Sequence, residues 1–164
     1  MNTDEDITLD TSWNLYFHDY MDSRWDRESY EIIGTVKTVI QFWTMFNIIK
    51  SKLDSGMFFL MREGVFPKWD DNLNKTFSFL TIKVTKQSVI SFAESLFVRM
   101  INNSIITNNK LPNTVIDGVS VSPKKNFCIF KLWICSEDED HKDITLYDIP
   151  NSYTGSVFFK DYSQ

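Results

Sequence analysis

Two amphipathic segments constrain the fold of this chain more than any other feature of its sequence. In the first, Thr38 and Gln41 form a capping box, which satisfies free backbone N–H groups at the start of a helix, and apolar residues follow at helical spacing to about Lys50. The second runs over residues 87–102, and its apolar side consists of Val89, Phe92, Leu96, Phe97 and Met100. The sequence therefore predicts two helices that each bury one face.

Strand-like segments, most of them with a two-residue period, surround these helices. Strands are expected at residues 13–17, 30–34, 57–61, 80–84, 127–134 and 156–162. This order of strands and helices predicts an α+β domain in which the helices pack on one face of an antiparallel sheet. We expect residues 1–11, which are polar and acidic, to form a flexible tail, and residues 12–164 to form a single domain.

Charge and cysteine content limit the classes of function. The formal net charge of −5 repels nucleic acid, so a general RNA or DNA binder that neutralises many phosphates is not expected. The spacing of Cys128 and Cys135 does not suggest a disulfide framework and favours a reducing compartment. Because no apolar run is long enough to span a membrane and the first residues do not resemble a signal peptide, we expect a cytoplasmic protein.

Motifs for catalysis and metal binding are absent from the sequence. His18, His141 and the two cysteines do not have the spacing of metal ligands, and there is no Gly-rich phosphate loop or nucleophile motif. Asp70 and Asp71 are adjacent carboxylates that a solvated loop pair explains, because an acid–base pair needs a shielded site and a substrate and nothing else in the sequence supports one. The sequence therefore predicts a binding protein rather than an enzyme, with no metal or cofactor.

Trp25 and Trp69 lie in segments that we expect to be loops, and Asp70 directly follows the second. A lone aromatic residue in a loop usually packs against the core, and that interpretation applies to both tryptophans. The alternative is a stacking site, because two indole faces, each roughly 3.5 Å from a 7-methylated guanine, stack on the base and attract its delocalised positive charge. A carboxylate beside the stack can accept the N1–H and N2–H of the base together.

Five motifs in order along the chain resemble those of the cap-binding eukaryotic translation initiation factor 4E family. They are the first strand at residues 13–17, the loop residue Trp25, the helix start at residues 38–43, the segment at residues 64–71 with Asn74 and Lys75 beyond it, and the second-helix motif at residues 92–97. The similarity covers nearly the whole chain after the acidic tail. It implies a curved antiparallel sheet with the helices packed on its convex face.

The resemblance also implies a site for the 7-methylguanosine cap of mRNA and a role in translation initiation. Trp25 and Trp69 would stack on the base, while Asp70 would bind its Watson–Crick edge. Trp133 matches a third tryptophan of the family, which contacts the methyl group. The phosphate groups of the cap would be bound by Lys124 and Lys131.

A second site is implied on the dorsal face, where the family binds a helical peptide of a scaffold protein or a repressor. The positions that match this site are Val39, Trp43, Glu94 and Phe97. Core packing is the ordinary interpretation of Trp43 on an amphipathic helix and of Trp133 in an apolar strand. Their assignment to binding sites therefore rests on the resemblance.

The chain departs from the family pattern at several positions. Asp70 stands where the family has Glu, and its side chain is shorter by about 1.5 Å. Residues 77–80 replace a Gly-Gly-Arg-Trp segment, which removes an arginine that helps to hold the cap phosphates. The His-Pro pair before the first strand is absent and the C-terminal part is shortened, as expected of a divergent member of the kind that a virus or a parasite encodes.

These departures leave three functions open. The first is a cap-binding adaptor that recruits the scaffold of the initiation complex. The second is a cap-binding repressor or decoy, which the absent His-Pro pair favours. The third is a relative that has lost cap binding and acts only as a protein-interaction module, which Asp70 and the missing arginine favour.

Overall fold

A curved antiparallel sheet with two α-helices on one face forms the fold. The computed structural model describes residues 5–68, 78–107 and 112–135 and the strand at residues 157–161. The strands are β1 (Thr8–His18), β2 (Tyr30–Thr38), β3 (Met57–Arg62), β4 (Ser78–Thr85), β5 (Ile116–Pro123), β6 (Phe127–Ile134) and β7 (Val157–Asp161). They form a seven-stranded sheet in the order β2-β1-β3-β5-β6-β4-β7.

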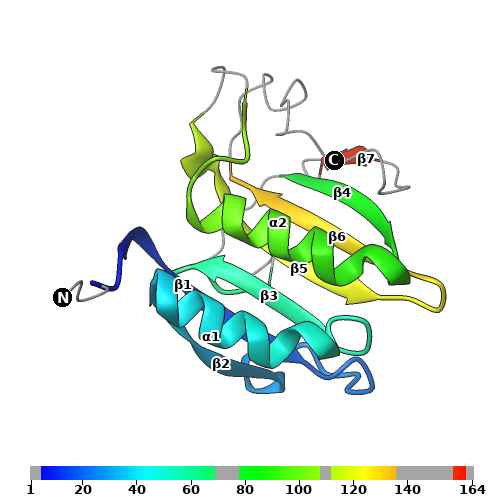
Figure 1. Ribbon diagram of the computed structural model, residues 1–164. Helices are drawn as coiled ribbons and strands as arrows, with labels where there is room; N and C mark the ends of the chain where they lie inside the picture. The colour runs from blue at the N-terminus through cyan, green and yellow to red at the C-terminus, as the bar shows by residue number, and fades with distance from the viewer. Residues whose placement is uncertain (1–4, 69–77, 108–111, 136–156, 162–164) are drawn as a thin grey trace.

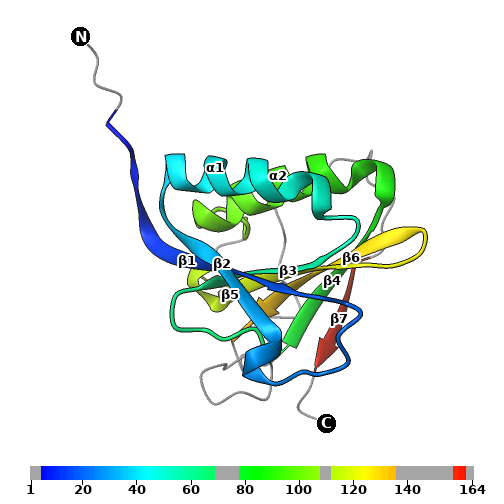
Figure 2. The same cartoon turned by 90° about the horizontal axis from the view of Figure 1, so that it is seen from below.

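The two helices, α1 (Val39–Ile49) and α2 (Val89–Ile101), lie side by side on the convex face of this sheet, as Figures 1 and 2 show. The predicted fold class is therefore confirmed. Short 3-10 turns connect some of the elements, namely η1 (Arg27–Ser29), η2 (Lys50–Lys52), η3 (Lys86–Ser88) and η4 (Asn113–Val115). Neither α-helix has the length and apolar character that crossing a membrane would require, and the same holds for every other helix in the described residues.

Helix α1 begins where the capping box predicts. Thr38 is its N-cap residue, and the hydroxyl of Thr38 accepts a hydrogen bond from the backbone N–H of Gln41 (3.2 Å). The side-chain oxygen of Gln41 accepts a bond from the backbone N–H of Lys37 (2.8 Å), one residue earlier than in an ideal capping box. Local sequence signals therefore position the start of this helix.

Strand β1 is longer than the alternation of apolar residues predicts, and it includes residues 8–11, which we expected in the tail. The residues before it also have a structural role. Asp6 accepts a hydrogen bond from the backbone N–H of Ile40 through its carboxylate (3.0 Å), and the carbonyl of Ile7 accepts one from the N–H of Val39 (2.9 Å). This acidic segment thus satisfies N–H groups of α1 and places a negative charge at its N-terminus.

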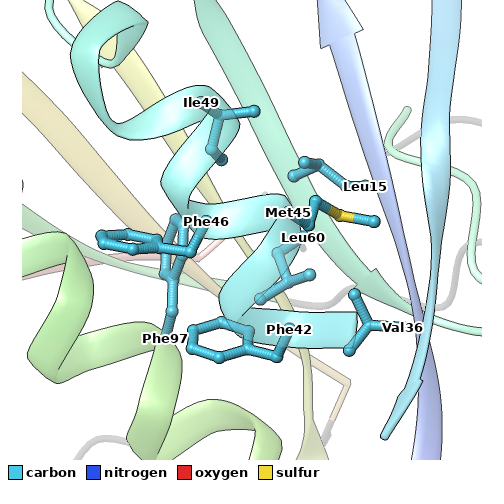
Figure 3. Close-up of a pocket in the computed structure, with 8 residues that line it drawn as sticks. All are labelled: Leu15, Val36, Phe42, Met45, Phe46, Ile49, Leu60 and Phe97. Carbon is cyan, nitrogen blue, oxygen red and sulfur yellow. The ribbon is translucent and has the colours of Figure 1, made fainter. Parts of the chain in front are cut away.

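The alternation of side chains along the strands separates two apolar clusters. Phe58 and Leu60 of β3 face the helices and belong to the main core, whereas Phe59 and Met61 face the opposite side. Figure 3 shows the packing of α1 on the sheet, where a cavity of about 10 Å³ remains among apolar side chains. Such a space has room for about one water and no polar partner for it, so it is a packing gap rather than a ligand site.

Candidate functional site

A cavity of about 500 Å³ lies on the face of the sheet opposite the helices. Its walls include members of the second apolar cluster, which consists of Tyr16, Tyr30, Phe59, Met61, Phe66, Phe79 and Trp133. Three of the residues that the sequence associates with a ligand also line it, namely Trp25, Lys131 and Trp133. A volume of this size is sufficient for a nucleotide-sized ligand.

Trp133, on β6, forms part of the cavity wall. It is only 5% exposed, and its ring packs edge-on against Phe79, with ring centroids 4.7 Å apart, and against Phe59. The indole N–H donates a hydrogen bond to the hydroxyl of Ser120 on the neighbouring strand β5 (3.1 Å). This bond and the edge contacts fix the orientation of the ring, which presents an immobile apolar surface to a ligand.

Trp25, in the connection between β1 and β2, is 46% exposed and stacks on the imidazole of His18. The two rings are almost parallel, at an interplanar angle of 3°, and their centroids are 4.0 Å apart. His18 itself is fully buried at the end of β1, and its Nε2–H donates to the carbonyl of Arg24 (2.7 Å). One face of the indole is therefore held by the protein, while its ring lines the cavity.

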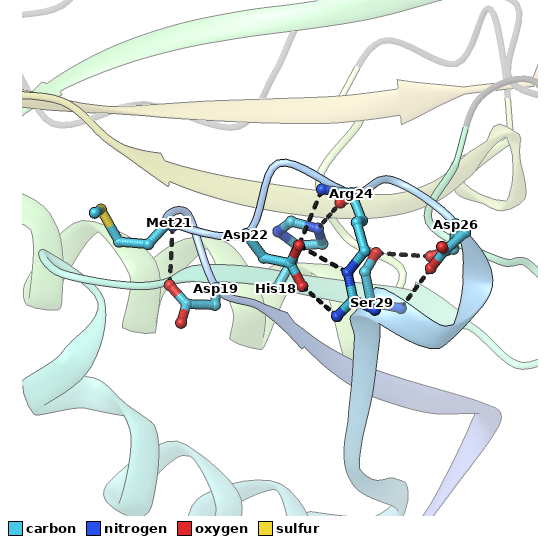
Figure 4. Close-up of polar contacts among 7 residues, drawn as sticks. All are labelled: His18, Asp19, Met21, Asp22, Arg24, Asp26 and Ser29. Atoms are coloured by element: carbon cyan, nitrogen blue, oxygen red, sulfur yellow. Dashed lines mark hydrogen bonds and ion pairs between the residues drawn. The ribbon is translucent and has the colours of Figure 1, made fainter.

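Two local hydrogen-bonded turns shape the chain on either side of Trp25 (Figure 4). Before it, the carboxylate of Asp22 accepts bonds from the backbone N–H of Arg24 (2.9 Å) and from its guanidinium (2.8 and 3.0 Å). These bonds from Arg24 lower the pKa of Asp22 to about 2. After it, Asp26 caps η1 by accepting a bond from the N–H of Ser29 (2.9 Å).

The segment after β3 brings a second loop to the same cavity. Gly64 has a φ of 91°, a conformation that favours glycine, and it turns the chain back across the sheet. Phe66 then packs edge-on against Tyr30 (5.0 Å between centroids), with the guanidinium of Arg27 over its ring at 4.2 Å. Pro67 and Lys68 line the cavity beside Trp25. Both Trp69 and Asp70, which follow directly, lie outside the described residues.

The two lysines that we expected to bind phosphate lie in different places. Lys131 lines the cavity, with its ammonium 5.4 Å from the ring centroid of Phe79. A second ammonium comes from Lys68, which the sequence analysis did not assign to the site. Lys124 lies in the turn between β5 and β6 and lines a separate cavity at the end of the sheet.

The residues expected on the dorsal face divide into surface and core positions. Trp43 is 38% exposed on α1, Val39 is half-buried at the start of that helix, and Glu94 is exposed on α2. Phe97 is only 2% exposed and packs edge-on against Phe46, so it supports the helices from below instead of forming their surface. Further apolar side chains are exposed on the two helices, namely Ile40, Ile48 and Ile90.

Sequence reasoning missed several residues of the site, and the most important is His18, which lies behind Trp25 and does not line the cavity itself. The signal for it was present, because His18 follows Tyr16 by two positions in β1 and so shares its face of the sheet. Phe79 lies where the chain departs from the family pattern, so motif matching could not assign it. The role of Lys68 depends on the turn at Gly64, which no local pattern predicts.

The described part of the chain contains neither a metal-binding cluster nor an activated cysteine. No three residues among its His, Cys, Asp and Glu lie close enough together to hold a metal ion. Cys128 and Cys135 are free thiols, and burial, followed by the charge of Asp117, raises the pKa of Cys135 to about 11. A thiol with so high a pKa is a poor nucleophile at neutral pH. The aromatic side chains that line the cavity are suited to a flat aromatic ligand.

Comparison with known proteins identifies the family. A family model described as Eukaryotic initiation factor 4E matches residues 8–152. The chain belongs to this family.

Eukaryotic translation initiation factor 4E type 1B of Mus musculus is 34% identical over 82 residues, which cover 48% of this chain and 34% of the mouse protein. Eukaryotic translation initiation factor 4E-1B of Danio rerio is 33% identical over 82 residues, or 48% of this chain and 38% of that protein. The matched segment therefore spans little more than a third of these curated relatives.

Solved structures of family members have the same fold. Initiation factor 4E-3 of Ascaris suum, in complex with an m7G cap, superposes with a TM-score of 0.70 and 20% identity over 83% of this chain and 77% of that one. A schistosome initiation factor 4E, in complex with m7GpppA and 4E-BP, gives a TM-score of 0.71 and 20% identity over 84% and 76% of the two chains. At this level of identity the likeness establishes the fold alone.

Proposed function

We propose that this protein binds the 7-methylguanosine cap of mRNA, with the methylated base between Trp25 and Trp69. The observation that carries the proposal is the orientation of Trp25, whose indole stacks on His18 and lines the cavity on the concave face. A base inserted into this cavity stacks on the indole, and its positive charge adds a cation–π attraction. Family membership supports the same ligand, because solved relatives are complexes with an m7G cap or m7GpppA.

The remaining groups of the cavity are assigned by their chemistry. Trp133 presents an apolar surface for the methyl group, and Lys131 and Lys68 supply positive charge for the phosphates. Trp69 directly follows Lys68 in the sequence, and we assign it to the second face of the base and Asp70 to the N1–H and N2–H edge. This assignment makes the protein a non-catalytic binding factor that acts on mRNA in the cytoplasm.

The dorsal helices are assigned to a protein partner. Exposed Trp43 and Ile40 on α1 give an apolar surface, and Glu94 on α2 adds a charge beside it. A solved relative is in complex with a 4E-BP, and another with the 4E-binding protein Mextli. We therefore assign this surface to an amphipathic helix of a scaffold or repressor, and the choice between those partners decides whether translation is promoted or blocked.

Titration with m7GTP and with GTP tests the cap site. Wild-type protein is expected to bind m7GTP with strong quenching of tryptophan fluorescence and to bind GTP much more weakly, because GTP lacks the positive charge. Replacement of either Trp25 or Trp69 by alanine removes one stacking face, which contributes about 1–3 kcal/mol, and is expected to weaken m7GTP binding roughly tenfold to a hundredfold by calorimetry.

Met21→Ala is the matched control, because Met21 is exposed in the same loop as Trp25 and does not line the cavity. It is expected to bind m7GTP as the wild type does. Equal binding of m7GTP and GTP would contradict the cation–π account. Absence of binding to both would leave the dorsal surface as the functional site and support an interaction module instead.

A further inference from the structure

A second cavity, of about 340 Å³, lies at one end of the sheet. Three lysines line it, Lys86, Lys124 and Lys125, and we call it the lysine cavity. Asp54, Ser55, Tyr20 and Pro123 complete its lining. The residues come from four separate segments, which Figure 1 shows meeting at the end of the molecule where the β5–β6 turn projects.

The charge of this cavity is opposite to that of the whole chain. The chain has a formal net charge of −5, yet three lysines face a single carboxylate, that of Asp54, in this lining. The ammonium of Lys86 is held by a hydrogen bond that it donates to the backbone carbonyl of Asp54 (2.5 Å). Lys124 and Lys125 are exposed in the turn between β5 and β6. Such a cluster attracts a flexible anion, and phosphate is a common ligand of lysine ammonium groups.

The lysine cavity adjoins the cavity that we assign to the cap. Ser122 lines the cap cavity and Pro123, the next residue of β5, lines the lysine cavity. Met57, the first residue of the neighbouring strand β3, lines the cap cavity, and Ser55, in the turn that precedes this strand, lines the lysine cavity. Consecutive strand residues point to opposite faces, so the two cavities lie on either side of this end of the sheet. A polymer that begins in the first cavity can reach the second around that end.

We propose that the lysine cavity binds a phosphodiester of the RNA nucleotides that follow the cap. Tyr20, exposed at the rim, provides an aromatic face on which one of their bases stacks. RNA fits better than an acidic segment of a protein because the cavity lies at the end of the sheet next to the cap cavity and combines cations with an aromatic ring, the combination by which single strands are bound. The inference rests on the proposed function, which it extends from the cap to the adjoining RNA.

The test compares m7GTP with a short m7G-capped RNA of several nucleotides. Wild-type protein is expected to bind the capped RNA more tightly than m7GTP, with a steeper dependence on salt. In the double variant Lys86→Gln with Lys125→Gln, binding of m7GTP is expected to stay unchanged, while the additional affinity for the capped RNA is lost. The slope of log K against log salt should fall by about 0.7 for each phosphate contact removed.

Two further variants separate an effect on RNA binding from an effect on folding. Lys125→Glu changes only an exposed turn residue and is expected to weaken the binding of capped RNA more than Lys125→Gln does. Lys37→Gln, in β2, removes the same charge away from the cavity and is expected to leave both affinities unchanged. Thermal unfolding of each variant reports whether the fold is intact.

Three outcomes would overturn the inference. One is equal affinity of the wild type for m7GTP and capped RNA. Another is an equal loss of affinity for both ligands in the double variant, which would show that these lysines act in the cap site or stabilise the fold. The third is displacement by a glutamate-rich peptide with no gain from RNA, which would assign the cavity to a protein. If wild-type protein binds no m7GTP at all, the proposed function itself fails, and this inference fails with it.

Discussion

At the scale of single residues, His18 determines how the indole of Trp25 is presented to the cavity. The imidazole lies parallel to the indole, 4.0 Å away, and its hydrogen bond to the carbonyl of Arg24 fixes its orientation. Immobilising a side chain on binding costs about 0.5–1.5 kcal/mol. Because His18 already restricts the indole in the free protein, part of this cost is removed before the ligand arrives.

Replacement of His18 by alanine is expected to weaken m7GTP binding by roughly threefold to tenfold, because Trp25 loses its support and must be ordered on binding. His18→Phe keeps a flat ring behind the indole and is expected to remain within about twofold of the wild type, since a stacked aromatic pair is retained. Calorimetry gives the affinities, and circular dichroism checks the fold. Unchanged affinity in His18→Ala would show that the loop orients Trp25 without this contact.

At the scale of elements, the sequence predicted best what local chemistry determines. The capping box at Thr38 located the start of α1, and helical periodicity located α2, because the signals lie within a few residues of the feature. The extent of β1 was underestimated, because pairing with β2 and β3 and the contacts of Asp6 with α1 depend on distant segments.

The residues of the candidate site were likewise predicted only in part. Trp25, Lys131 and Trp133 were assigned to a ligand on motif resemblance, and the structure places all three around one cavity. Lys124 was assigned to the same ligand but lines the lysine cavity, because it lies in the β5–β6 turn beyond the paired residues. Phe97 was assigned to the dorsal surface on the resemblance, but it is buried against Phe46 of α1, as the helical periodicity of residues 87–102 predicts.

The N-terminus of α1 provides a test of the segment before β1. Thr38→Ala is expected to lower the free energy of unfolding by about 1 kcal/mol, because the N–H of Gln41 loses its acceptor. Asp6→Ala is expected to lower it by about 0.5–1 kcal/mol, and less at high salt, because a carboxylate is removed from a helix N-terminus.

Urea denaturation measures both effects. Asp10→Ala is the matched control, because Asp10 is an exposed acidic residue on β1, and it should leave the stability nearly unchanged. If Asp6→Ala and Asp10→Ala have the same effect, the contribution of Asp6 is general charge and not a cap on α1.

At the scale of the whole molecule, one sheet separates the two proposed binding surfaces. The cavity that we assign to the cap lies against one face. Helices α1 and α2 cover the other face, as Figure 2 shows, so the proposed RNA and protein partners approach from opposite sides. The main core fills the space between the sheet and the helices. In the proposed function, an mRNA end and a protein partner can therefore bind together without obstructing each other.

Trp43→Ala is expected to weaken binding of a 4E-BP peptide at least tenfold, because exposed tryptophans are frequent hot spots of interfaces and their truncation costs about 2 kcal/mol or more. Ile32→Ala is the matched control, since Ile32 is an exposed apolar residue of β2 and not of the helices. Fluorescence anisotropy of a labelled peptide measures both. A similar loss in the two variants would move the protein-binding surface from the helices toward the edge of the sheet.

The alternation along β6 has a consequence for how such a protein can diversify. Phe130, Leu132 and Ile134 face the helices and maintain the core, whereas Lys131 and Trp133 face the cavity. We therefore expect neighbouring codons of one strand to be under different selection, one set mainly for cellular abundance and the other mainly for ligand preference. At Lys131, which lies outside both apolar clusters, a lineage can change what the cavity recognises with little effect on the folded lifetime.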